Sequence, residues 1–296
     1  MKKFLIVFGI TASVFLAAAG GYAFYLYSSA KQAVTRMQEP VETNEPKPVF
    51  ATENLPPISI LLLGVDERAN DKGRSDTMIV VTVNPKRESM LLFNIPRDTR
   101  TEIIGKGTVD KINHAYSFGG PQMAMDTVEH FLDMKLDYFV KINMQSFQEI
   151  VDAVGGVTVN NPSAFSFEGY EFPAGSQQLN GSEALAYSRM RYDDKKGDLG
   201  RNDRQRQVIQ SIISKGANVS TITKFDNILE ILSKNVKTNM TFDEMQDIQS
   251  NYKNARRTIE STEIKGVGQR LNGVWYYSVS EEERLRVVRL IKEHMS

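Results

Sequence analysis

The sequence contains no cysteine. Thiol nucleophiles, disulfide bonds and cysteine-ligated zinc are therefore excluded, and the absence suits an exported protein. An excess of charge of either sign is also missing, since 36 basic residues balance 36 acidic ones. The chain thus lacks the broad positive field that non-specific binding to nucleic acid requires, and we expect no nucleic-acid partner.

The motifs of several enzyme classes are absent as well. The chain has three histidines, and His114, His130 and His294 lie too far apart in sequence to form a zinc-binding motif. It contains neither a P-loop nor the Gly-x-Ser-x-Gly motif of serine hydrolases. These absences exclude the familiar nucleotide, zinc and serine chemistries.

A long uncharged segment lies near the N-terminus. No charged side chain occurs between residues 4 and 30, and residues 4–27 are mostly apolar. As a helix, residues 4–27 would be about 36 Å long, enough to cross a bilayer. Lys2 and Lys3 precede the segment, so the positive-inside rule predicts a single-pass type II protein of the cell membrane. A cleaved signal peptide is the alternative, because the alanines at 17–19 resemble a cleavage site.

The rest of the chain divides into a spacer and one domain. Five of the ten prolines fall between residues 28 and 57, where no apolar periodicity occurs. About 240 residues remain, which suits one sizeable domain. We therefore predict a cytoplasmic tail at 1–3, a transmembrane signal-anchor at 4–27, an extracytoplasmic linker at 28–57 and a catalytic domain at 58–296.

Strand and helix patterns alternate within the domain. The run at 58–65 is continuously apolar and predicts a strand covered on both faces. The runs at 77–83 and 90–95 predict a hairpin, and residues 137–142 predict a further strand. Helical spacing or capping signals predict helices at 124–132, 147–154, from 182, 202–215, 224–235, from 241 and from 280. This order is typical of a three-layer α/β/α sandwich with a mixed central sheet.

Two aspartates flank the loop between the first two predicted strands. Asp66 follows the run at 58–65, and Asp76 precedes the run at 77–83. If these strands are neighbours, the two carboxylates lie together at one edge of the sheet, where they can hold Mg²⁺ or Mn²⁺ with waters and substrate phosphates. The alternative is that the aspartates cap turns and face solvent.

Five arginines occur between residues 189 and 206. Arg189 and Arg191 are expected to point the same way in an extended stretch, because side chains alternate along a strand. Two adjacent guanidinium groups suit a pyrophosphate, which they bind with paired, charge-assisted hydrogen bonds.

The remaining arginines fall on the helix predicted at 202–215 or just before it. Arg201 and Gln205 are one turn apart on the inward-facing stripe, so we expect them to point toward the site. Arg204 and Arg206 are expected to face water. A solvated or salt-bridged helix face is the alternative for all of them.

A further polar segment follows the second strand of the hairpin. Pro96 ends the strand pairing there and directs Arg97 away from the edge of the sheet. The next loop supplies Lys111, Asn113, His114 and Tyr116 as further polar groups, although a lone histidine in a loop is more often structural.

Taken together, the motifs resemble those of the LytR-CpsA-Psr family of Gram-positive cell envelopes. They occur in family order, and the resemblance covers roughly residues 55–296. The matching stretches are Leu63-Gly-Val-Asp66, Arg74-Ser-Asp-Thr77, Asn94-Ile-Pro-Arg-Asp-Thr99, Lys111-Ile-Asn-His-Ala-Tyr116, Asp137-Tyr-Phe-Val140, Leu179-Asn-Gly-Ser-Glu-Ala-Leu-Ala-Tyr187, and Arg189-Met-Arg191 on to Gln205. One departure is the loop at 192–200, which lacks the proline and phenylalanine that are common in the family.

The resemblance implies a transferase of phosphorus-containing groups. Such a domain would take a wall glycopolymer such as teichoic acid from a polyprenyl pyrophosphate and pass it to peptidoglycan. The metal ligands would be Asp66 and Asp76. The pyrophosphate would be bound by Arg74, Arg97, Arg189, Arg191, Arg201 and Gln205, and the catalytic residues would be Arg74, Asp76, Arg97, Arg189 and Arg191.

The chemistry that follows is in-line phosphoryl transfer, in which positioned cations stabilise the developing charge. A polyprenyl pyrophosphate pyrophosphohydrolase and a non-catalytic lipid-binding regulator are the alternatives. The sequence does not choose between Asp76 and a metal-bound oxygen as proton acceptor, and it does not identify the polymer.

Overall fold

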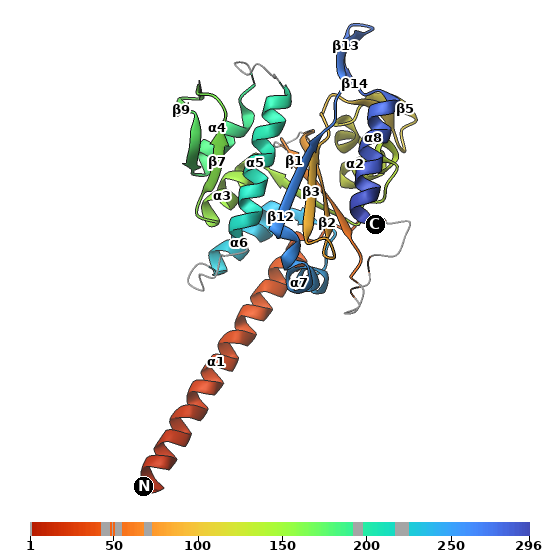
Figure 1. The fold of residues 1–296 in the computed structure, drawn as a ribbon. Coiled ribbons are helices and arrows are strands. Elements are labelled where there is room, and N and C mark those ends of the chain that lie inside the picture. Colours follow the sequence, from red (N-terminus) through yellow and green to blue (C-terminus); the bar gives the residue numbers. More distant parts are fainter. Residues whose placement is uncertain are drawn as a thin grey trace.

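The computed structural model describes residues 2–42, 48, 50, 55–67, 73–191, 198–216 and 225–296. A six-stranded sheet forms its centre, in the order β11-β6-β1-β2-β3-β12 (Figure 1). Its strands are β1 (Ile58–Val65), β2 (Ser75–Asn84), β3 (Ser89–Asn94), β6 (Tyr138–Asn143), β11 (Val236–Thr238) and β12 (Thr258–Glu263). The pairs β1/β6 and β3/β12 are parallel and the other pairs are antiparallel, so the predicted mixed sheet is confirmed.

The predicted hairpin is formed by β2 and β3. Asn84 ends β2, and its side-chain oxygen accepts hydrogen bonds from the backbone amides of Lys86 and Arg87, at 3.0 and 3.1 Å. Glu88, the last residue of the turn, has a φ of 49°. Asparagine stabilises such turns by hydrogen bonding to the backbone that follows it, which fixes the register of the two strands.

One face of the sheet is covered by α2 (His114–Leu132) and α8 (Glu281–Met295) (Figure 1). The buried side chains of this layer include Leu61, Leu63 and Val65, which alternate along β1 as expected for one face of a strand. At the start of α8, the Ser280 side chain accepts a hydrogen bond from the backbone amide of Glu283 at 3.2 Å, as the sequence predicts.

The opposite face carries the second helical layer (Figure 1). Two of its helices begin with capping boxes, at Asn180 with Glu183 and at Thr241 with Glu244, and the second of these was predicted. The helices of this layer are α3 (Met144–Ala153), α4 (Gly181–Arg189), α5 (Asp198–Gly216), α6 (Phe225–Asn235) and α7 (Phe242–Asn251). The three-layer arrangement is therefore the predicted one.

Short hairpins and a 3-10 turn complete the described part of the domain. The strand that follows Gly156 belongs to one of these small sheets and not to the central one. The hairpins pair β4 (Arg100–Ile103) with β5 (Thr108–Lys111), β7 (Val157–Asn161) with β10 (Gly175–Leu179), β8 (Phe165–Phe167) with β9 (Tyr170–Phe172), and β13 (Val267–Leu271) with β14 (Val274–Ser278), while Lys253–Arg257 form the turn.

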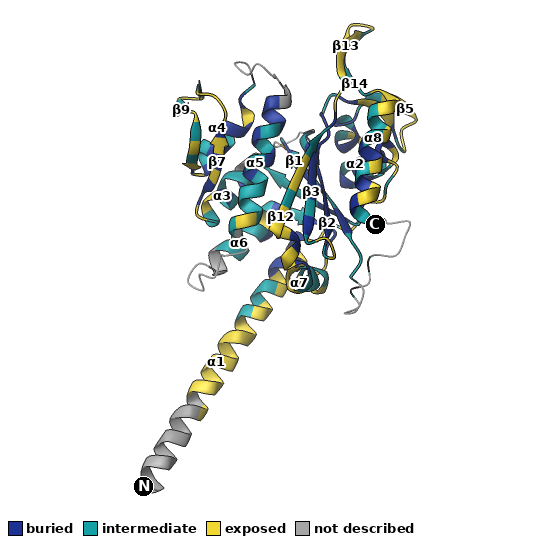
Figure 2. Cartoon of the chain, viewed as in Figure 1, coloured by how far each residue is buried: buried dark blue, intermediate teal, exposed yellow. Residues whose placement is uncertain are grey.

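The N-terminal helix is longer than the predicted anchor. It spans Lys2–Met37 (α1), so the first part of the expected linker is helical, because residues 28–37 contain neither proline nor glycine. Ala33 and Met37 are buried against the domain, and Lys237 Nζ donates a hydrogen bond to the carbonyl of Arg36 at 2.7 Å. Figure 2 shows that most of α1 is exposed where its side chains are described. Among all the residues that the structure describes, none of the helices has the length and the apolar character of a membrane span.

The expected linker also contacts the domain further along. The ring of Phe50 packs edge-on against Tyr252, with centroids 5.8 Å apart, and Leu55 packs against the same core. Phe50 and Leu55 of this segment therefore pack against the domain. Isolated apolar residues of this kind have no periodicity that the sequence could reveal.

Candidate functional site

The site begins where β1 ends and β2 starts. Val65 pairs with Ser75 after a bulge at Asp76 of β2, so the two strands are antiparallel neighbours and the condition stated for the aspartates is met. The backbone amides of Asp66 and Asp76 both donate to the carbonyl oxygen of Arg74, at 3.3 and 3.0 Å. This shared acceptor brings the two aspartates to one edge of the sheet.

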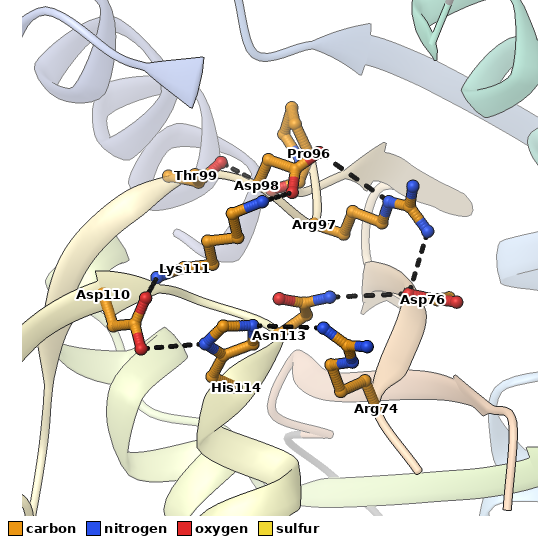
Figure 3. A network of polar contacts seen from close by, with 10 residues as sticks. All are labelled: Arg74, Asp76, Pro96, Arg97, Asp98, Thr99, Asp110, Lys111, Asn113 and His114. Atoms are coloured by element: carbon orange, nitrogen blue, oxygen red, sulfur yellow. Dashed lines mark hydrogen bonds and ion pairs between the residues drawn. The ribbon is translucent and has the colours of Figure 1, made fainter. Parts of the chain in front are cut away.

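Arg97 joins the same edge from the turn after β3 (Figure 3). Its Nη1 lies 3.0 Å from Asp76 Oδ1, and Asn113 Nδ2 donates to the same oxygen at 3.4 Å. Lys111 Nζ lies 2.8 Å from Asp98 Oδ1. These contacts fix the positions of two cations and two carboxylates at the edge before any substrate is bound, which is the preorganisation that charge stabilisation requires.

The third part of this network contains Arg74 and His114 (Figure 3). Asp110 Oδ2 lies 2.8 Å from His114 Nδ1, and Arg74 Nη1 lies 3.5 Å from His114 Nε2. Burial raises the pKa of Asp110, but the hydrogen bonds from His114 and from the backbone amide of Lys111 outweigh burial and hold this pKa below its usual value. Asp110 is therefore a carboxylate that orients the imidazole ring.

Arg189 and Arg191 approach from the other side of the sheet. Arg189 is the last residue of α4, and the backbone amide of Met190 still donates to the carbonyl of Ala186 at 3.2 Å. The expectation of an extended stretch is therefore wrong, because good helix formers carry α4 through Arg189 and leave Arg191 just beyond it. The Arg189 side chain is 50% exposed and forms an ion pair with Glu168 at 3.1 Å.

The arginines of α5 are more buried than expected. Arg201, Arg204 and Arg206 are exposed by only 7%, 4% and 6%. The inward orientation predicted for Arg201 is confirmed, whereas the expectation that Arg204 and Arg206 face water is wrong. The backbone carbonyl of Met190 accepts a hydrogen bond from Arg204, and Asn94 Oδ1 accepts one from Arg206 at 3.2 Å.

Arg204 and Arg206 each also have neighbours that stabilise the buried charge. The Arg204 guanidinium carbon lies 5.3 Å from the ring centroid of Phe165 and 5.9 Å from that of Tyr187. Arg206 forms ion pairs with Asp203 in the preceding turn and with Glu263 of β12. These partners allow burial of a guanidinium group. Arg204 and Arg206 therefore stabilise the structure next to the site.

Gln205 links α5 to the strand that leads to Arg97. Its Oε1 accepts a hydrogen bond at 3.3 Å from Asn94, the last residue of β3, which lies three positions before Arg97. Gln205 and Arg189 both line an apolar cavity of about 380 Å³ on this face of the sheet. Of the residues predicted to bind the pyrophosphate, Arg189 and Gln205 therefore line this cavity, whereas Arg74 and Arg97 belong to the network at the edge of the sheet.

The cavity itself has one polar end. Its polar lining includes Thr77, Asn143 and Gln205, and the pairing of β1 places Thr77 beside Gly64 and Asn143 beside Val65, at the edge where Asp66 lies. The rest of the lining is apolar and comes from every layer on that side, including Ile60, Leu62, Ile79, Val81, Val140, Phe147, Ile150, Ile209, Ile212, Ile213 and Leu232. Such a cavity suits an amphiphile whose charged head stays at the edge and whose tail is buried.

Two site residues carry no clear signal in the sequence. Asp110 belongs to β5, before α2, and Glu168 lies in the turn of the β8/β9 hairpin with a φ of 50°. Asp110 is four residues before His114, but this spacing indicates contact only in a helix, which begins here at His114 itself. Glu168 meets Arg189 only because the hairpin folds over α4.

The predicted binding of a divalent cation by the acidic pair stays a prediction. Two carboxylates with waters and phosphate oxygens are a usual magnesium site, and Asp66 and Asp76 provide that donor set. In the described ranges, no three His, Asp or Glu side chains lie close enough to hold a metal by themselves. A cation would therefore depend on oxygen atoms of the bound substrate.

These observations define a class of protein: an α/β/α domain with arginines at one edge of its sheet and a largely apolar cavity on one face of the sheet. The chain belongs to the LytR-CpsA-Psr family, whose model matches residues 24–293. It is similar to the polyisoprenyl-teichoic acid–peptidoglycan teichoic acid transferase TagU of Bacillus subtilis (strain 168), with 53% identity over 277 residues that make up 93% of this chain and 90% of TagU.

Solved structures show the same fold. The crystal structure of B. subtilis TagU superposes with a TM-score of 0.67 at 52% identity, covering 81% of this chain and 97% of that one. A structure of TagT bound to LIIa-WTA superposes with a TM-score of 0.71 at 27% identity, covering 87% of this chain and 99% of that one.

Proposed function

We propose that this chain transfers a wall glycopolymer, most simply teichoic acid, from a polyprenyl pyrophosphate carrier to peptidoglycan. The observation that carries the proposal is the largely apolar cavity of about 380 Å³, whose lining includes Arg189 and Gln205. The transferase name of the B. subtilis relative, at 53% identity, supports the same activity.

The cavity accounts for the lipid part of the substrate. Burying an alkyl group contributes roughly 0.8 kcal/mol for each CH₂. A polyprenyl chain that enters between Ile60 and Leu62 of β1 and Ile209 of α5 would be held mainly by this burial. The anionic head group would then stay at the polar end.

The arginines account for the head group. A guanidinium group binds phosphate oxygens with two parallel hydrogen bonds. The cations proposed to hold the pyrophosphate are Arg74, Arg97, Arg189, Arg191 and Arg201, with Gln205 beside them. A hydroxyl of peptidoglycan attacks the phosphorus on the sugar side. A new O–P bond forms, the bond from this phosphorus to the bridging oxygen breaks, and polyprenyl phosphate leaves with the bridging oxygen.

Asp66 and Asp76 would hold Mg²⁺ or Mn²⁺ at the same edge. When bound, the cation would neutralise charge on the pyrophosphate oxygens. The chain's own contribution is to orient Asp76, which Arg97 contacts at 3.0 Å and Asn113 at 3.4 Å.

We also propose that α1 is a membrane anchor, with residues 1–3 in the cytoplasm and the domain outside. The absence of charge between residues 4 and 30 supports this, as do exposed apolar side chains such as Phe15 and Phe24. An anchor keeps the opening of the cavity near the bilayer in which a lipid-linked substrate moves.

The test combines the protein with lipid-linked polymer, Mg²⁺ and peptidoglycan. The expected result is a covalent polymer–peptidoglycan adduct together with released polyprenyl phosphate. Replacement of Arg189 by alanine should abolish the adduct while the melting temperature is retained. Hydrolysis without an adduct would identify a pyrophosphohydrolase, and lipid binding without turnover would identify a regulator; either result overturns the proposal.

A further inference from the structure

The contacts of His114 assign its ring protons. A guanidinium group has only donors, so His114 Nε2, which lies 3.5 Å from Arg74 Nη1, must be the nitrogen with the free electron pair. The proton then resides on Nδ1, which donates to Asp110 Oδ2 at 2.8 Å (Figure 3). An imidazole oriented by a carboxylate, with its other nitrogen free to accept a proton, is the arrangement of a general base.

The surroundings of His114 cover its side chain only in part. The side chains of His114 and Asp110 are 22% and 28% exposed. The ring of Phe118 packs edge-on against the imidazole at 6.0 Å, and on Phe118 lies Lys106, whose Nζ is 3.0 Å from the ring centroid. Among the described charged groups, Asp110 and Arg74 contact the imidazole ring, and Lys106 contacts the Phe118 ring beside it.

Other charged residues of the network are engaged with one another. Lys111 forms an ion pair with Asp98, and Asp76 forms one with Arg97. Asp76 Oδ1 also accepts a hydrogen bond from Asn113, and the proposed cation needs the same carboxylate. Asp76 Oδ1 is thus already engaged with Arg97 and Asn113, whereas His114 Nε2 has an electron pair that faces Arg74 at the edge.

We propose that His114, oriented by Asp110, is the general base that takes the proton from the attacking hydroxyl of the acceptor. This inference rests on the proposed transfer reaction. As the acceptor oxygen bonds to phosphorus and the bridging P–O bond breaks, the hydroxyl proton moves to His114 Nε2. Asp110 stabilises the imidazolium that forms, and the proton is later lost to water.

Arg74 connects this step to substrate binding. In the present structure its Nη1 lies 3.5 Å from Nε2 and faces the electron pair of this nitrogen. Phosphate oxygens are stronger acceptors than an imidazole nitrogen, so a bound pyrophosphate draws Arg74 away and frees Nε2. The base is then available only when the lipid substrate is bound. This limits hydrolysis, in which water takes the place of the acceptor hydroxyl.

The test compares His114→Gln and Asp110→Asn with His130→Gln. His130 is a suitable control because it lies on the same helix, is 53% exposed and is 3.8 Å from its nearest acidic partner, Glu102. The measurements are kcat and KM for the lipid substrate in the transfer assay across pH, the melting temperature, and lipid binding without acceptor. The activity of His114→Ala is also measured with added imidazole.

General base catalysis contributes about 100-fold to 10,000-fold to a rate. His114→Gln should therefore lower kcat at least about 100-fold with little change in KM or lipid binding, and Asp110→Asn should lower it less. Imidazole should partly restore His114→Ala, and His130→Gln should match wild type.

Two results would overturn the inference while leaving the transfer function intact. One is a wild-type kcat in His114→Gln. The other is an increase in KM alone, which would mean that the histidine only positions Arg74. If His114→Gln does not fold, the unchanged fold of Asp110→Asn allows the same comparison. If wild-type protein makes no adduct, the proposed function itself fails.

Discussion

Arg97 and Asp76 form an ion pair 3.0 Å long between the turn after β3 and the second residue of β2. The pair joins two strands that are neighbours in the sheet but separated by the rest of the hairpin in sequence. It places a guanidinium group beside the carboxylate proposed to hold the cation. Neither side chain is free to rotate away from the edge.

Replacing Arg97 by alanine tests this relationship. The variant loses a preorganised cation, so transfer activity should fall by about 100-fold or more. The melting temperature should change little, since partly exposed ion pairs contribute only about 0–1 kcal/mol. Arg257→Ala is the matched control, because Arg257 pairs with Glu88 on the exposed surface at the far end of β3. Equal losses in the two variants would contradict a role at the site.

Asp66→Asn should weaken the dependence on a divalent cation. A neutral amide oxygen is a poorer ligand for Mg²⁺ than a carboxylate, so more Mg²⁺ should be needed for half-maximal activity. Chelation should abolish the activity of the wild type, and added Mg²⁺ or Mn²⁺ should restore it. The control is Asp243→Asn on the exposed first turn of α7. A Mg²⁺ titration that does not distinguish Asp66→Asn from wild type would remove the proposed cation site.

Glu168→Gln should release Arg189 for the substrate. The pair is half-exposed at 3.1 Å, and such pairs contribute only about 0.2–1 kcal/mol. KM for the lipid should therefore fall by roughly two- to five-fold, and kcat should be unchanged. The difference should shrink at high salt, which screens the ion pair. Glu171→Gln, in the exposed next strand of the same hairpin, should behave like wild type.

The parts of the fold that sequence predicts well depend on local signals. The capping box at Thr241 with Glu244 and the hairpin around Asn84 are each formed by residues a few positions apart. The proximity of Asp66 and Asp76 also follows from sequence, because a short polar loop between two apolar strands forces its ends together. The edge of the site was therefore predictable.

The burial of the arginines was not predictable in the same way. Arg206 can be buried because Asn94 of β3 accepts its hydrogen bond and Glu263 of β12 forms an ion pair with it. The cavity is equally hidden, since Ile60 and Leu62 have the composition of ordinary core residues. Only the packing of α5 against the sheet decides whether such side chains meet each other or leave a space.

Ile60→Trp should block the cavity. The indole would fill part of its volume of about 380 Å³ from β1, which leaves less room for a long polyprenyl chain. KM for a long-chain carrier should rise about ten-fold, because less alkyl surface is buried, whereas a short-chain carrier should be used normally. Leu285→Trp, on the exposed side of α8, is the control. Equal effects on long and short carriers would argue that the tail binds elsewhere.

His294 should make the stability of the domain depend on pH. Its ring lies 2.7 Å from Thr82 Oγ1 and 3.0 Å from Ser89 Oγ, and burial, aided by the charge of Arg87 and opposed by that of Glu260, lowers its pKa. The folded protein therefore binds this proton less readily than the unfolded chain, whose histidine has a pKa of 6.5. Stability from His294 is present above pH 6.5 and is lost as the pH falls through the lower, folded value.

The prediction is checked by melting temperature against pH. Wild type should lose stability between neutral pH and pH 5, and His294→Ala should lose less over this range while being less stable by about 1–3 kcal/mol at neutral pH, because Thr82 and Ser89 keep buried hydroxyls without their ring partner. His130→Gln should follow wild type, since its exposed ring makes no such contacts. If the melting temperature of His294→Ala depends on pH as strongly as that of wild type, other groups cause the acid sensitivity. The neutral ring of His294 would then not be what stabilises the packing of the C-terminal helix.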